Sequence, residues 1–356
     1  MLKKIAIIGI QGVPAHYGGF ETLVENIIGE NCSLDVEYTI LCSARDCQEK
    51  VNIYKGARLK YIPMVHANGA QSTIYDILSM IRVINGYDAV VILGVSGCLF
   101  LPFFRLFFRK KLIVNIDGLE HKREKWGRFA KWFLRSSESM AVRFADVVIA
   151  DNKGIQDYVY ETYQKKAELI AYGGDHVKRI VHGHKQQRIL HNFHLSEGDY
   201  AISVCRIEPE NNCHITLEAF ANLALRLVFI GNWNKSDYGR ELKKKFQIYD
   251  NITMLDSIYD LDVLYVLRSN ASYYIHGHSA GGTNPSLVEA MFFSCPILAY
   301  NVVYNRETTE NCAYYFSSSL DIVNLLSLPL KGKRMIEIAE EKYTWRKIAV
   351  QYEALY

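Results

Sequence analysis

A strand, a glycine-rich loop and the start of a helix follow one another in Ala271-Ser-Tyr-Tyr-Ile-His276-Gly-His278-Ser-Ala-Gly281-Gly282-Thr283-Asn284-Pro285-Ser286-Leu-Val-Glu289-Ala290-Met291. Proline is favoured at the first position of a helix, and Thr283 or Asn284 would cap this one. We therefore expect a buried parallel strand over 271–275 and a helix over 285–292. The N–H groups at a helix start attract anions, so this segment is a candidate phosphate site. Its candidate ligand-binding residues are Gly282, Thr283, Asn284 and Ser286.

The same alternation of short apolar runs and helix-like segments extends over the 356 residues of the chain. Runs typical of buried parallel strands occur at 5–8, 38–42, 89–93, 112–116 and 147–150, and again at 201–205, 226–230, 252–255, 271–275 and 296–299. Helix-like segments lie between them, for example at 21–28, 73–84 and 215–223. The pattern predicts an α/β fold of two Rossmann-like, doubly wound domains joined near Tyr172. Ligands bind beyond the carboxyl ends of such strands, so the two domains would face a central cleft.

Composition excludes several other classes of protein. Hydrophobic residues make up 49% and charged residues 22% of the chain, which is typical of a folded globular protein. The net charge of +3 is too balanced for a general nucleic-acid binder, and no apolar run reaches the roughly 18 residues of a membrane span. We interpret the N-terminal apolar run as a first strand rather than a signal peptide. The eight cysteines form no Cys-x-x-Cys pair, which predicts no zinc site and no disulfide framework, in a reducing cytoplasm.

A second glycine-rich loop follows the first predicted strand, in Gly9-Ile-Gln-Gly12-Val-Pro14-Ala-His-Tyr17-Gly18-Gly19-Phe20-Glu21. Glycines let a backbone approach a ligand closely, and the helix that follows favours an anion at its start. We interpret the loop as a ligand loop with Gly18 and Gly19 as binding residues, and a plain tight turn is the alternative. The loop is not a Gly-x-Gly-x-x-Gly fingerprint, and no acidic residue marks a ribose site about 20 residues later.

Carboxylates come directly after two predicted strands of the first half. Asp117 and Glu120 follow the strand at 112–116, and Asp151 follows the strand at 147–150. Such side chains can bind a sugar hydroxyl or orient an incoming acceptor. Helix capping is the alternative, because Asp and Asn favour turns and caps for their own conformational reasons.

In the second half, Arg206 follows the strand at 201–205. An arginine at the carboxyl end of a strand can hold a pyrophosphate through two charge-assisted hydrogen bonds, whereas the alternative, a surface pair with an acidic neighbour, would stabilise little. Glu289 lies one turn into the helix that follows the glycines, in an otherwise apolar run. A carboxylate so near to bound phosphates is consistent with binding ribose hydroxyls.

A basic and aromatic segment extends over 100–135. Residues 101–143 contain eleven Lys and Arg against four acidic residues, interleaved with Phe and Trp. Cations and large apolar side chains at helical spacing suit contact with an anionic membrane surface, where each surface cation contributes about 1 kcal/mol. A core helix with a solvated basic face is the alternative. Nucleic acid is a less favoured partner, because no binding motif accompanies the segment.

These segments together resemble a known family. Arg206 to Asn212, Gly281 to Met291 and Tyr304-Asn-Arg-Glu307 resemble the bacterial rhamnosyltransferases within family 4 of the retaining glycosyltransferases. The loop Gly9 to Glu21, Asp117-Gly-Leu-Glu120 and the C-terminal segment Tyr343 to Tyr356 resemble the same subgroup. The resemblance extends from one end of the chain to the other.

The resemblance implies a GT-B fold with an acceptor-binding domain over 1–172, a nucleotide-sugar-binding domain over 173–340, and a helix over 341–356 that crosses back to the first domain. It implies metal-independent transfer of a deoxyhexose, L-rhamnose from dTDP-L-rhamnose, with retention. The implied acceptor is a sugar on undecaprenyl pyrophosphate at the cytoplasmic face of the cell membrane, in capsule or O-antigen assembly. The protein would then be cytoplasmic and peripheral on the anionic inner-membrane surface.

Two positions depart from the wider family. Glu289 is present, but Gly281 stands where that family has an earlier Glu, and Asn211 stands where a phosphate-binding Lys is expected. Both departures fit the rhamnosyltransferase subgroup.

The mechanism that the resemblance implies gives each candidate a role. Arg206 and the start of the 285–292 helix would hold the charge that develops on the leaving pyrophosphate, and Glu289 would bind ribose. Asp117, ranked before Asp151, would orient the acceptor hydroxyl. A transferase with another nucleotide sugar, a sugar-nucleotide epimerase of the same fold, a nicotinamide-dependent oxidoreductase and a non-catalytic membrane or scaffold protein are the alternatives.

Overall fold

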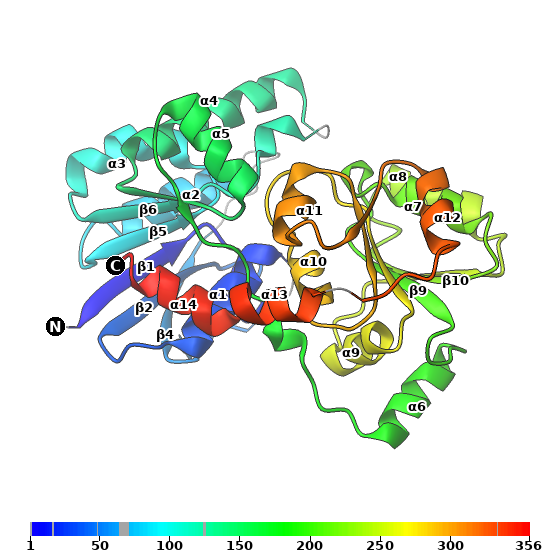
Figure 1. The fold of residues 1–356 in the computed structure, drawn as a ribbon. Helices are drawn as coiled ribbons and strands as arrows, with labels where there is room; N and C mark the ends of the chain where they lie inside the picture. Colours follow the sequence, from blue (N-terminus) through cyan, green and yellow to red (C-terminus); the bar gives the residue numbers. More distant parts are fainter. Residues whose placement is uncertain (1, 16–17, 48, 64–70, 124–125, 333) are drawn as a thin grey trace. The chain divides into compact units, whose positions relative to one another are not determined.

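The computed structural model describes residues 2–15, 18–47, 49–63, 71–123, 126–332 and 334–356. The chain forms two compact units (Figure 1). The first unit comprises residues 1–172 together with 345–356, and the second comprises residues 173–344. Each unit is built around its own sheet with helices on both faces.

The sheet of the first unit has the strand order β3-β4-β2-β1-β5-β6-β7-β8. Its strands run parallel except β3, which pairs antiparallel with β4. The strands are β1 (Lys3–Ile8), β2 (Val36–Ser43), β3 (Ile53–Tyr54), β4 (Ala57–Ile62), β5 (Ala89–Leu93), β6 (Lys111–Asn115), β7 (Val147–Ala150) and β8 (Glu168–Leu169). The five strands predicted in this half are confirmed, with ends shifted by a few residues.

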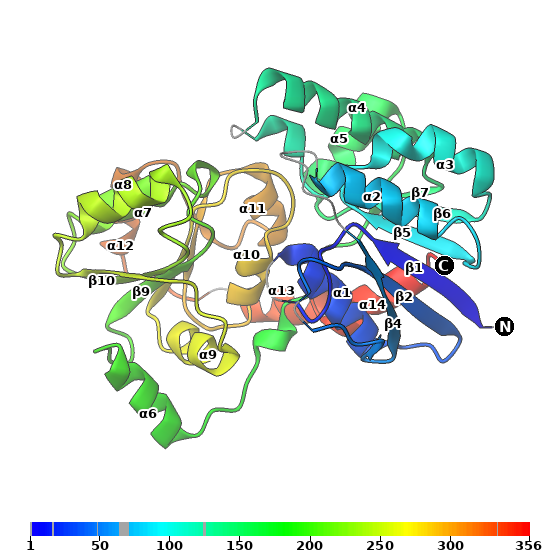
Figure 2. The same cartoon turned by 180° about the vertical axis from the view of Figure 1, so that it is seen from behind.

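Helices cover both faces of this sheet. One face carries α1 (Gly19–Glu30) and the C-terminal helix α14 (Trp345–Glu353), and the other carries α2 (Gln71–Arg82), α3 (Leu101–Phe107), α4 (Arg128–Phe144) and α5 (Lys153–Tyr163) (Figures 1 and 2). Because both faces are covered, the central strands are continuous apolar runs, and Ile5 to Ile8 are at most 1% exposed. Trp345, Ile348 and Tyr352 line one side of α14 and pack into the core of this unit.

The sheet of the second unit is entirely parallel, in the order β11-β10-β9-β12-β13-β14. Its strands are β9 (Tyr200–Val204), β10 (Arg226–Ile230), β11 (Ile252–Leu255), β12 (Tyr273–His276), β13 (Ile297–Tyr300) and β14 (Tyr314–Phe316). The helices are α6 (Gly183–Asn192), α7 (Cys213–Phe220), α8 (Asp237–Phe246), α9 (Leu261–Ser269), α10 (Pro285–Ala290), α11 (Val303–Thr308), α12 (Ser319–Leu326) and α13 (Met335–Lys342). The two predicted Rossmann-like sheets are thus confirmed.

The sheet orders decide which loops are neighbours. In the first unit β6 lies between β5 and β7, and in the second β9 lies between β10 and β12. The loops after β6 and β7 are therefore neighbours at the carboxyl ends of the strands of the first sheet. The loops after β9 and β12 are neighbours at the carboxyl ends of the strands of the second sheet. These four loops contain the candidate carboxylates, Arg206 and the glycine-rich segment.

Candidate functional site

The loop after β9 and the loop after β12 are joined by hydrogen bonds at the carboxyl edge of the second sheet. The backbone N–H and the hydroxyl of Ser279 both donate to the carbonyl of Glu210 at 2.8 Å, and Asn212 Nδ2 donates to the carbonyl of Gly277 at 2.8 Å. Gly277 has no room for a side chain, because a Cβ there would lie 2.1 Å from the carbonyl oxygen of Asn211. The segment that contains Arg206 and the glycine-rich segment are therefore one structural unit.

Asn211 is the centre of this junction. It is 3% exposed, its Nδ2 donates to the carbonyl of Arg206 at 2.7 Å, and its Oδ1 lies 2.7 Å from His278 Nδ1. A carbonyl can only accept, which fixes the orientation of the Asn211 amide and makes Nδ1 of His278 the donor. The amide of Asn211 thus connects the backbone of Arg206 to the glycine-rich loop.

The side chain of Arg206 is 41% exposed and lies two residues beyond β9, with Nη1 3.8 Å from Glu208 Oε2. An ion pair of that length and exposure stabilises the fold little. The arrangement leaves the guanidinium exposed at the edge where ligands of such sheets bind.

Glu289 has two partners that sequence analysis missed. Its Oε2 lies 2.6 Å from Arg268 Nη2, and its Oε1 lies 3.4 Å from His176 Nε2. Burial opposes ionisation of this carboxyl group, but the charge of Arg268 and the contact with His176 outweigh burial and lower its pKa to about 2. The carboxylate is therefore ionised at neutral pH and retains lone pairs for further hydrogen bonds.

Arg268 is 3% exposed and belongs to α9, in which it follows the apolar run from Val263 to Leu267. A buried arginine requires an anionic partner. An arginine at the end of this apolar run is therefore the one sequence signal that points to a partner such as Glu289. Gly174, at the start of the second unit, lies against α10, since a Cβ there would come 2.9 Å from Val288 Cγ1. That close packing brings His176 to Glu289.

The helix after the glycines is shorter than predicted. It begins at Pro285, as expected, but ends at Ala290 instead of 292, and residues 291–294 continue as turns. Asn284 caps it, with Oδ1 accepting from the N–H of Ser286 at 2.9 Å. Gly281 and Gly282 adopt φ of +39° and +74°. Thr283 is buried. Asn284, another of the loop's predicted binding residues, caps the helix and occupies one of the N–H groups at its start.

In the first unit, Asp117 and Asp151 lie at the carboxyl ends of the adjacent strands β6 and β7. Burial, and then the negative charges of these two carboxylates, raise the pKa of Tyr172 well above its usual value, which places both near one phenol. Asn152, not Asp151, caps α5, with Oδ1 accepting from the N–H of Gly154 at 2.9 Å. Asp151 is buried, and Asp117 has φ of +60°, which is rare for a residue other than glycine.

The described part of the loop at 9–21 is held by carboxylates of α1. Glu21 Oε1 accepts from the N–H of Gln11 at 2.9 Å, and Glu25 Oε2 accepts from the N–H of Ala15 at 2.6 Å. A Cβ on Gly18 would lie 2.1 Å from Glu21 Oε2. The carboxylate of Glu21 thus occupies the start of α1, where the sequence predicts an anion of a ligand; binding by Gly18 and Gly19 stays a prediction.

The basic and aromatic segment has a buried half and an exposed half. Phe104 and Phe108 belong to the core, whereas Phe103 and Phe107 of α3 are 61% and 69% exposed. On α4, Phe129 and Trp132 are 77% and 63% exposed, with ring centroids 5.9 Å apart. We call these four exposed side chains, with the cations Arg128, Lys131 and Arg135 of α4, the basic–aromatic surface. Its aromatic side chains are not part of the core.

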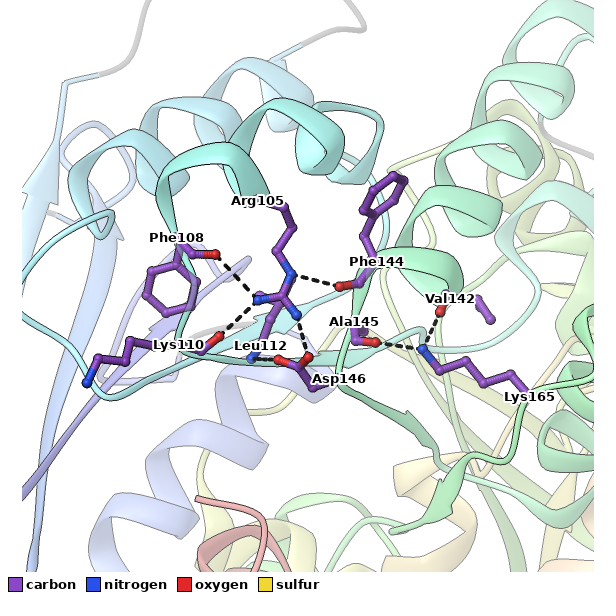
Figure 3. A network of polar contacts seen from close by, with 9 residues as sticks. All are labelled: Arg105, Phe108, Lys110, Leu112, Val142, Phe144, Ala145, Asp146 and Lys165. Atoms are coloured by element: carbon purple, nitrogen blue, oxygen red, sulfur yellow. Dashed lines mark hydrogen bonds and ion pairs between the residues drawn. The ribbon is translucent and has the colours of Figure 1, made fainter.

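Arg105, which the sequence groups with these cations, has a structural role instead (Figure 3). Its Nε donates to the carbonyl of Phe144 at 3.0 Å and its Nη1 to that of Lys110 at 2.9 Å, while Nη2 lies 2.5 Å from Asp146 Oδ1. Lys165 likewise donates to carbonyls at the end of α4, those of Val142 and Ala145. These cations connect α3, α4 and the start of β6 to one another.

The described residues contain neither a cluster of metal-ligating side chains nor a helix that could span a membrane. No group of three or more His, Cys, Asp and Glu side chains is placed to hold a metal ion in that part of the chain. Nor does any helix there have the length and apolar character needed to cross a membrane.

Comparison with known proteins agrees with this arrangement. Residues 186–314 match the family "Glycosyl transferases group 1", and residues 2–175 match a domain of unknown function, DUF1972. No curated protein matches the chain in sequence.

Solved structures that are similar in fold include the following three. Sucrose-phosphate synthase from Thermosynechococcus elongatus has a TM-score of 0.82 at 16% identity, covering 99% of this chain and 98% of that one. HepE of Anabaena, in complex with UDP and glucose, has a TM-score of 0.78 at 14% identity, with coverage of 99% and 98%. A putative UDP-N-acetylglucosamine 2-epimerase from Listeria monocytogenes has a TM-score of 0.64 at 13% identity, with coverage of 99% and 95%. The GT-B fold is thereby confirmed, and the chain is a glycosyltransferase with a group 1 domain over residues 186–314 and a DUF1972 domain over residues 2–175.

Proposed function

We propose that this glycosyltransferase transfers L-rhamnose from dTDP-L-rhamnose, with retention, to a sugar on undecaprenyl pyrophosphate. Transfer would take place at the cytoplasmic face of the cell membrane, in the assembly of a surface polysaccharide such as capsule or O-antigen. The observation that carries the proposal is the junction of the Arg206 loop with the glycine-rich loop, in the same unit as the ionised carboxylate of Glu289.

The second unit supplies the donor site in this proposal. Arg206 binds the diphosphate, and the loop from Gly282 to Ser286 lines the same site. Glu289, held by Arg268 and His176, accepts hydrogen bonds from the ribose hydroxyls. The UDP and glucose in the structure of HepE support a nucleotide-sugar donor for a chain of this fold.

Departure of the nucleotide diphosphate is the step that these groups promote. As the bond between the sugar carbon and the phosphate oxygen lengthens, negative charge grows on the pyrophosphate. A fixed cation aimed at that charge stabilises the transition state more than the ground state. The acceptor hydroxyl attacks from the same face and passes its proton to the departing phosphate, so the reaction needs no separate pair of catalytic carboxylates. Asp117, or in second place Asp151, orients that hydroxyl.

The first unit supplies the acceptor site and the contact with the membrane. Exposed Phe103, Phe107, Phe129 and Trp132 present apolar area, and the cations of α4 complement an anionic leaflet. Liposomes with 30% anionic lipid should therefore bind the wild-type protein, and the double variant Phe129→Ala/Trp132→Ala should bind much less. Leu34→Ala is the matched control, because Leu34 is 98% exposed in the same unit but lies outside this surface.

The direct test is transfer from dTDP-L-rhamnose to synthetic lipid-linked sugars, with the anomeric configuration of the product read by NMR. We expect the transferred rhamnose to have the same anomeric configuration as in the donor, which is the outcome of a retaining reaction, and we expect undiminished transfer in EDTA. Turnover with another nucleotide sugar but not with dTDP-L-rhamnose would overturn the donor assignment.

The same-fold epimerase is the second candidate, favoured by the likeness to the Listeria protein. An epimerase converts its nucleotide sugar without any acceptor. Incubation of the protein with dTDP-L-rhamnose or UDP sugars alone distinguishes the two, because the transferase leaves the donor sugar unchanged at every carbon.

A further inference from the structure

A carboxylate is buried in the middle of α4, where two tyrosines and a histidine meet it. Glu138 is 1% exposed, and three donors meet it. Its Oε1 accepts from the hydroxyls of Tyr158 at 2.8 Å and Tyr163 at 2.7 Å, and its Oε2 lies 3.1 Å from His121 Nδ1. These donors come from α5 and from the 3₁₀ turn Glu120–Lys122, so a single carboxylate joins three elements.

The hydrogen bonds fix the protonation of the cluster. Burial opposes the charge of Glu138, but the bonds from His121 and the two tyrosines outweigh burial and lower its pKa. An ionised carboxylate can only accept, so Nδ1 of His121 carries a hydrogen in either charge state of the ring. Lys122 also lies near the cluster, with Nζ 5.0 Å from the centre of the Tyr158 ring.

The turn that Glu138 holds continues directly from Asp117. The backbone of Asp117 is at φ +60°, a conformation that persists only where the surroundings enforce it. From one side, the N–H of Asp117 donates to Asn115 Oδ1 at 3.0 Å, and Asn115 Nδ2 donates to the hydroxyl of Tyr352 at 2.9 Å. From the other side, His121 is held by Glu138.

The carboxylate of Glu120 is also fixed. It lies 2.8 Å from Arg123 Nη2, and the two side chains are 20% and 11% exposed. Residues 115–123, which we call the acceptor loop, are therefore held at both ends and in the middle by polar contacts. A loop with this many buried polar contacts is preorganised rather than shaped by its ligand.

We propose that Glu138 is a positioning residue for the acceptor, which acts through His121 to hold the acceptor loop where Asp117 meets the acceptor hydroxyl. This inference rests on the proposed function, because it assigns the acceptor to the first unit. Glu138 itself is buried and touches no substrate. His121 acts through Nδ1, toward the protein, and not through Nε2.

Two substitutions of His121 separate positioning from direct contact. The side-chain nitrogen of asparagine takes the place of Nδ1, and that of glutamine takes the place of Nε2. We expect His121→Asn to keep near-wild-type kinetics and His121→Gln to raise the acceptor KM about tenfold, the loss of one hydrogen bond to a charged group. The opposite order would show that His121 touches the acceptor through Nε2 and would overturn the proposal.

Glu138→Gln, which removes the charge at constant shape, should raise the acceptor KM about tenfold as well and leave the donor KM unchanged. Glu161→Gln is the matched control, since Glu161 is an exposed carboxylate on α5. Equal kinetics of Glu138→Gln and Glu161→Gln would refute a positioning role. Should Glu138→Gln fail to fold, the two His121 variants still decide.

A readout without catalysis keeps this inference separate from the proposed function. Amide hydrogen exchange of residues 115–123 in the full chain should speed up in Glu138→Gln and His121→Gln, but not in His121→Asn or Glu161→Gln. Unchanged exchange in all four would overturn the inference. If exchange changes as expected while no acceptor is glycosylated from any donor, the proposed function fails and the role of Glu138 in holding the loop stands.

Discussion

The guanidinium of Arg268 lies 2.6 Å from the carboxylate of Glu289, and the arginine is 3% exposed. The two side chains come from α9 and α10, which precede and follow β12. The ion pair therefore holds the helix that follows the glycine-rich loop against its neighbour. It also keeps the carboxylate of Glu289 ionised at neutral pH.

Removal of one partner of this pair should cost more than removal of both. Arg268→Met leaves the mostly buried carboxylate of Glu289 with His176 as its remaining partner, and we expect a loss of about 3–5 kcal/mol in the free energy of unfolding. The double variant Arg268→Met/Glu289→Gln buries no charge at that place and should recover a large part of the loss. Urea unfolding of the wild type and the variants measures these free energies of unfolding. An equal loss of stability in the single and the double variant would contradict the burial argument.

The same pair gives the fold a pH dependence of known sign. The pKa of Glu289 in the folded chain is about 2, below its ordinary value of 4.5. The folded state therefore favours the ionised form, and its contribution to stability is present above pH 4.5 and lost as the pH falls towards 2. In Glu289→Gln, the free energy of unfolding, measured with urea, should therefore depend less on pH between pH 5 and pH 2 than it does in the wild type.

The strands that are buried on both faces can be predicted from the sequence. The run at 5–8 is apolar at every position because helices lie on both sides of the sheet, and periodicity alone identifies such strands. The two-residue strands β3 and β8 contain no such signal, and β4 alternates buried and exposed residues in part of its length. Those strands were missed because their pairing depends on their neighbours rather than on their own composition.

The candidate site was predictable by residue type and position, but not by partner. Glycines and an arginine after strands mark the loops of unit two, and the sheet order then brings those loops together. Arg268 is 21 residues from Glu289, and nothing local connects them. The structural role of Arg105 cannot be predicted from the sequence, because its acceptors are mostly backbone carbonyls, which leave no mark in a sequence.

Arg206 and Asn211 should respond differently to substitution. In the proposed mechanism, Arg206→Ala removes the cation that faces the developing charge, so kcat should fall by about 10²–10³ while the fold is unchanged. Asn211→Lys introduces the residue of the wider family into a buried position, where it leaves His278 Nδ1 facing a cation. We expect reduced stability and no gain in turnover, measured by thermal unfolding and by transfer kinetics. Higher turnover in Asn211→Lys would show that a lysine there can still reach the diphosphate.

Asp76 of α2 is predicted to make the fold more stable at low pH than at high pH. Burial raises its pKa to about 8, although the N–H of Gly97 donates to it. The folded state thus keeps a proton that the unfolded state releases near pH 4, and stability falls as the pH rises from about 4 to 8. Asp76→Asn, which cannot ionise, should be several kcal/mol more stable relative to the wild type at pH 8 than at pH 4. Urea unfolding at the two values tests this, and a constant difference between the proteins would show that Asp76 is ionised in the fold.

Arg105→Lys should reduce stability without affecting contact with lipid. The guanidinium of Arg105 reaches the carbonyls of Phe144, Phe108 and Lys110 and the carboxylate of Asp146 from a rigid planar fork. A lysine ammonium carries the same charge but offers one nitrogen, so most of these acceptors would lose their partner. The side chain is 19% exposed, and we expect a loss of about 2 kcal/mol in urea unfolding.

Arg128→Lys is the control for that substitution, because Arg128 is exposed in the first turn of α4 and should change neither stability nor liposome binding. Arg128→Glu, by contrast, should weaken binding to anionic liposomes by about 1–2 kcal/mol, since it replaces an attracted charge by a repelled one. Arg105→Lys should bind the same liposomes as the wild type at a temperature where it is folded. A loss of lipid binding in folded Arg105→Lys would mean that the network around Asp146 opens at the membrane, because only then could the guanidinium reach a phosphate.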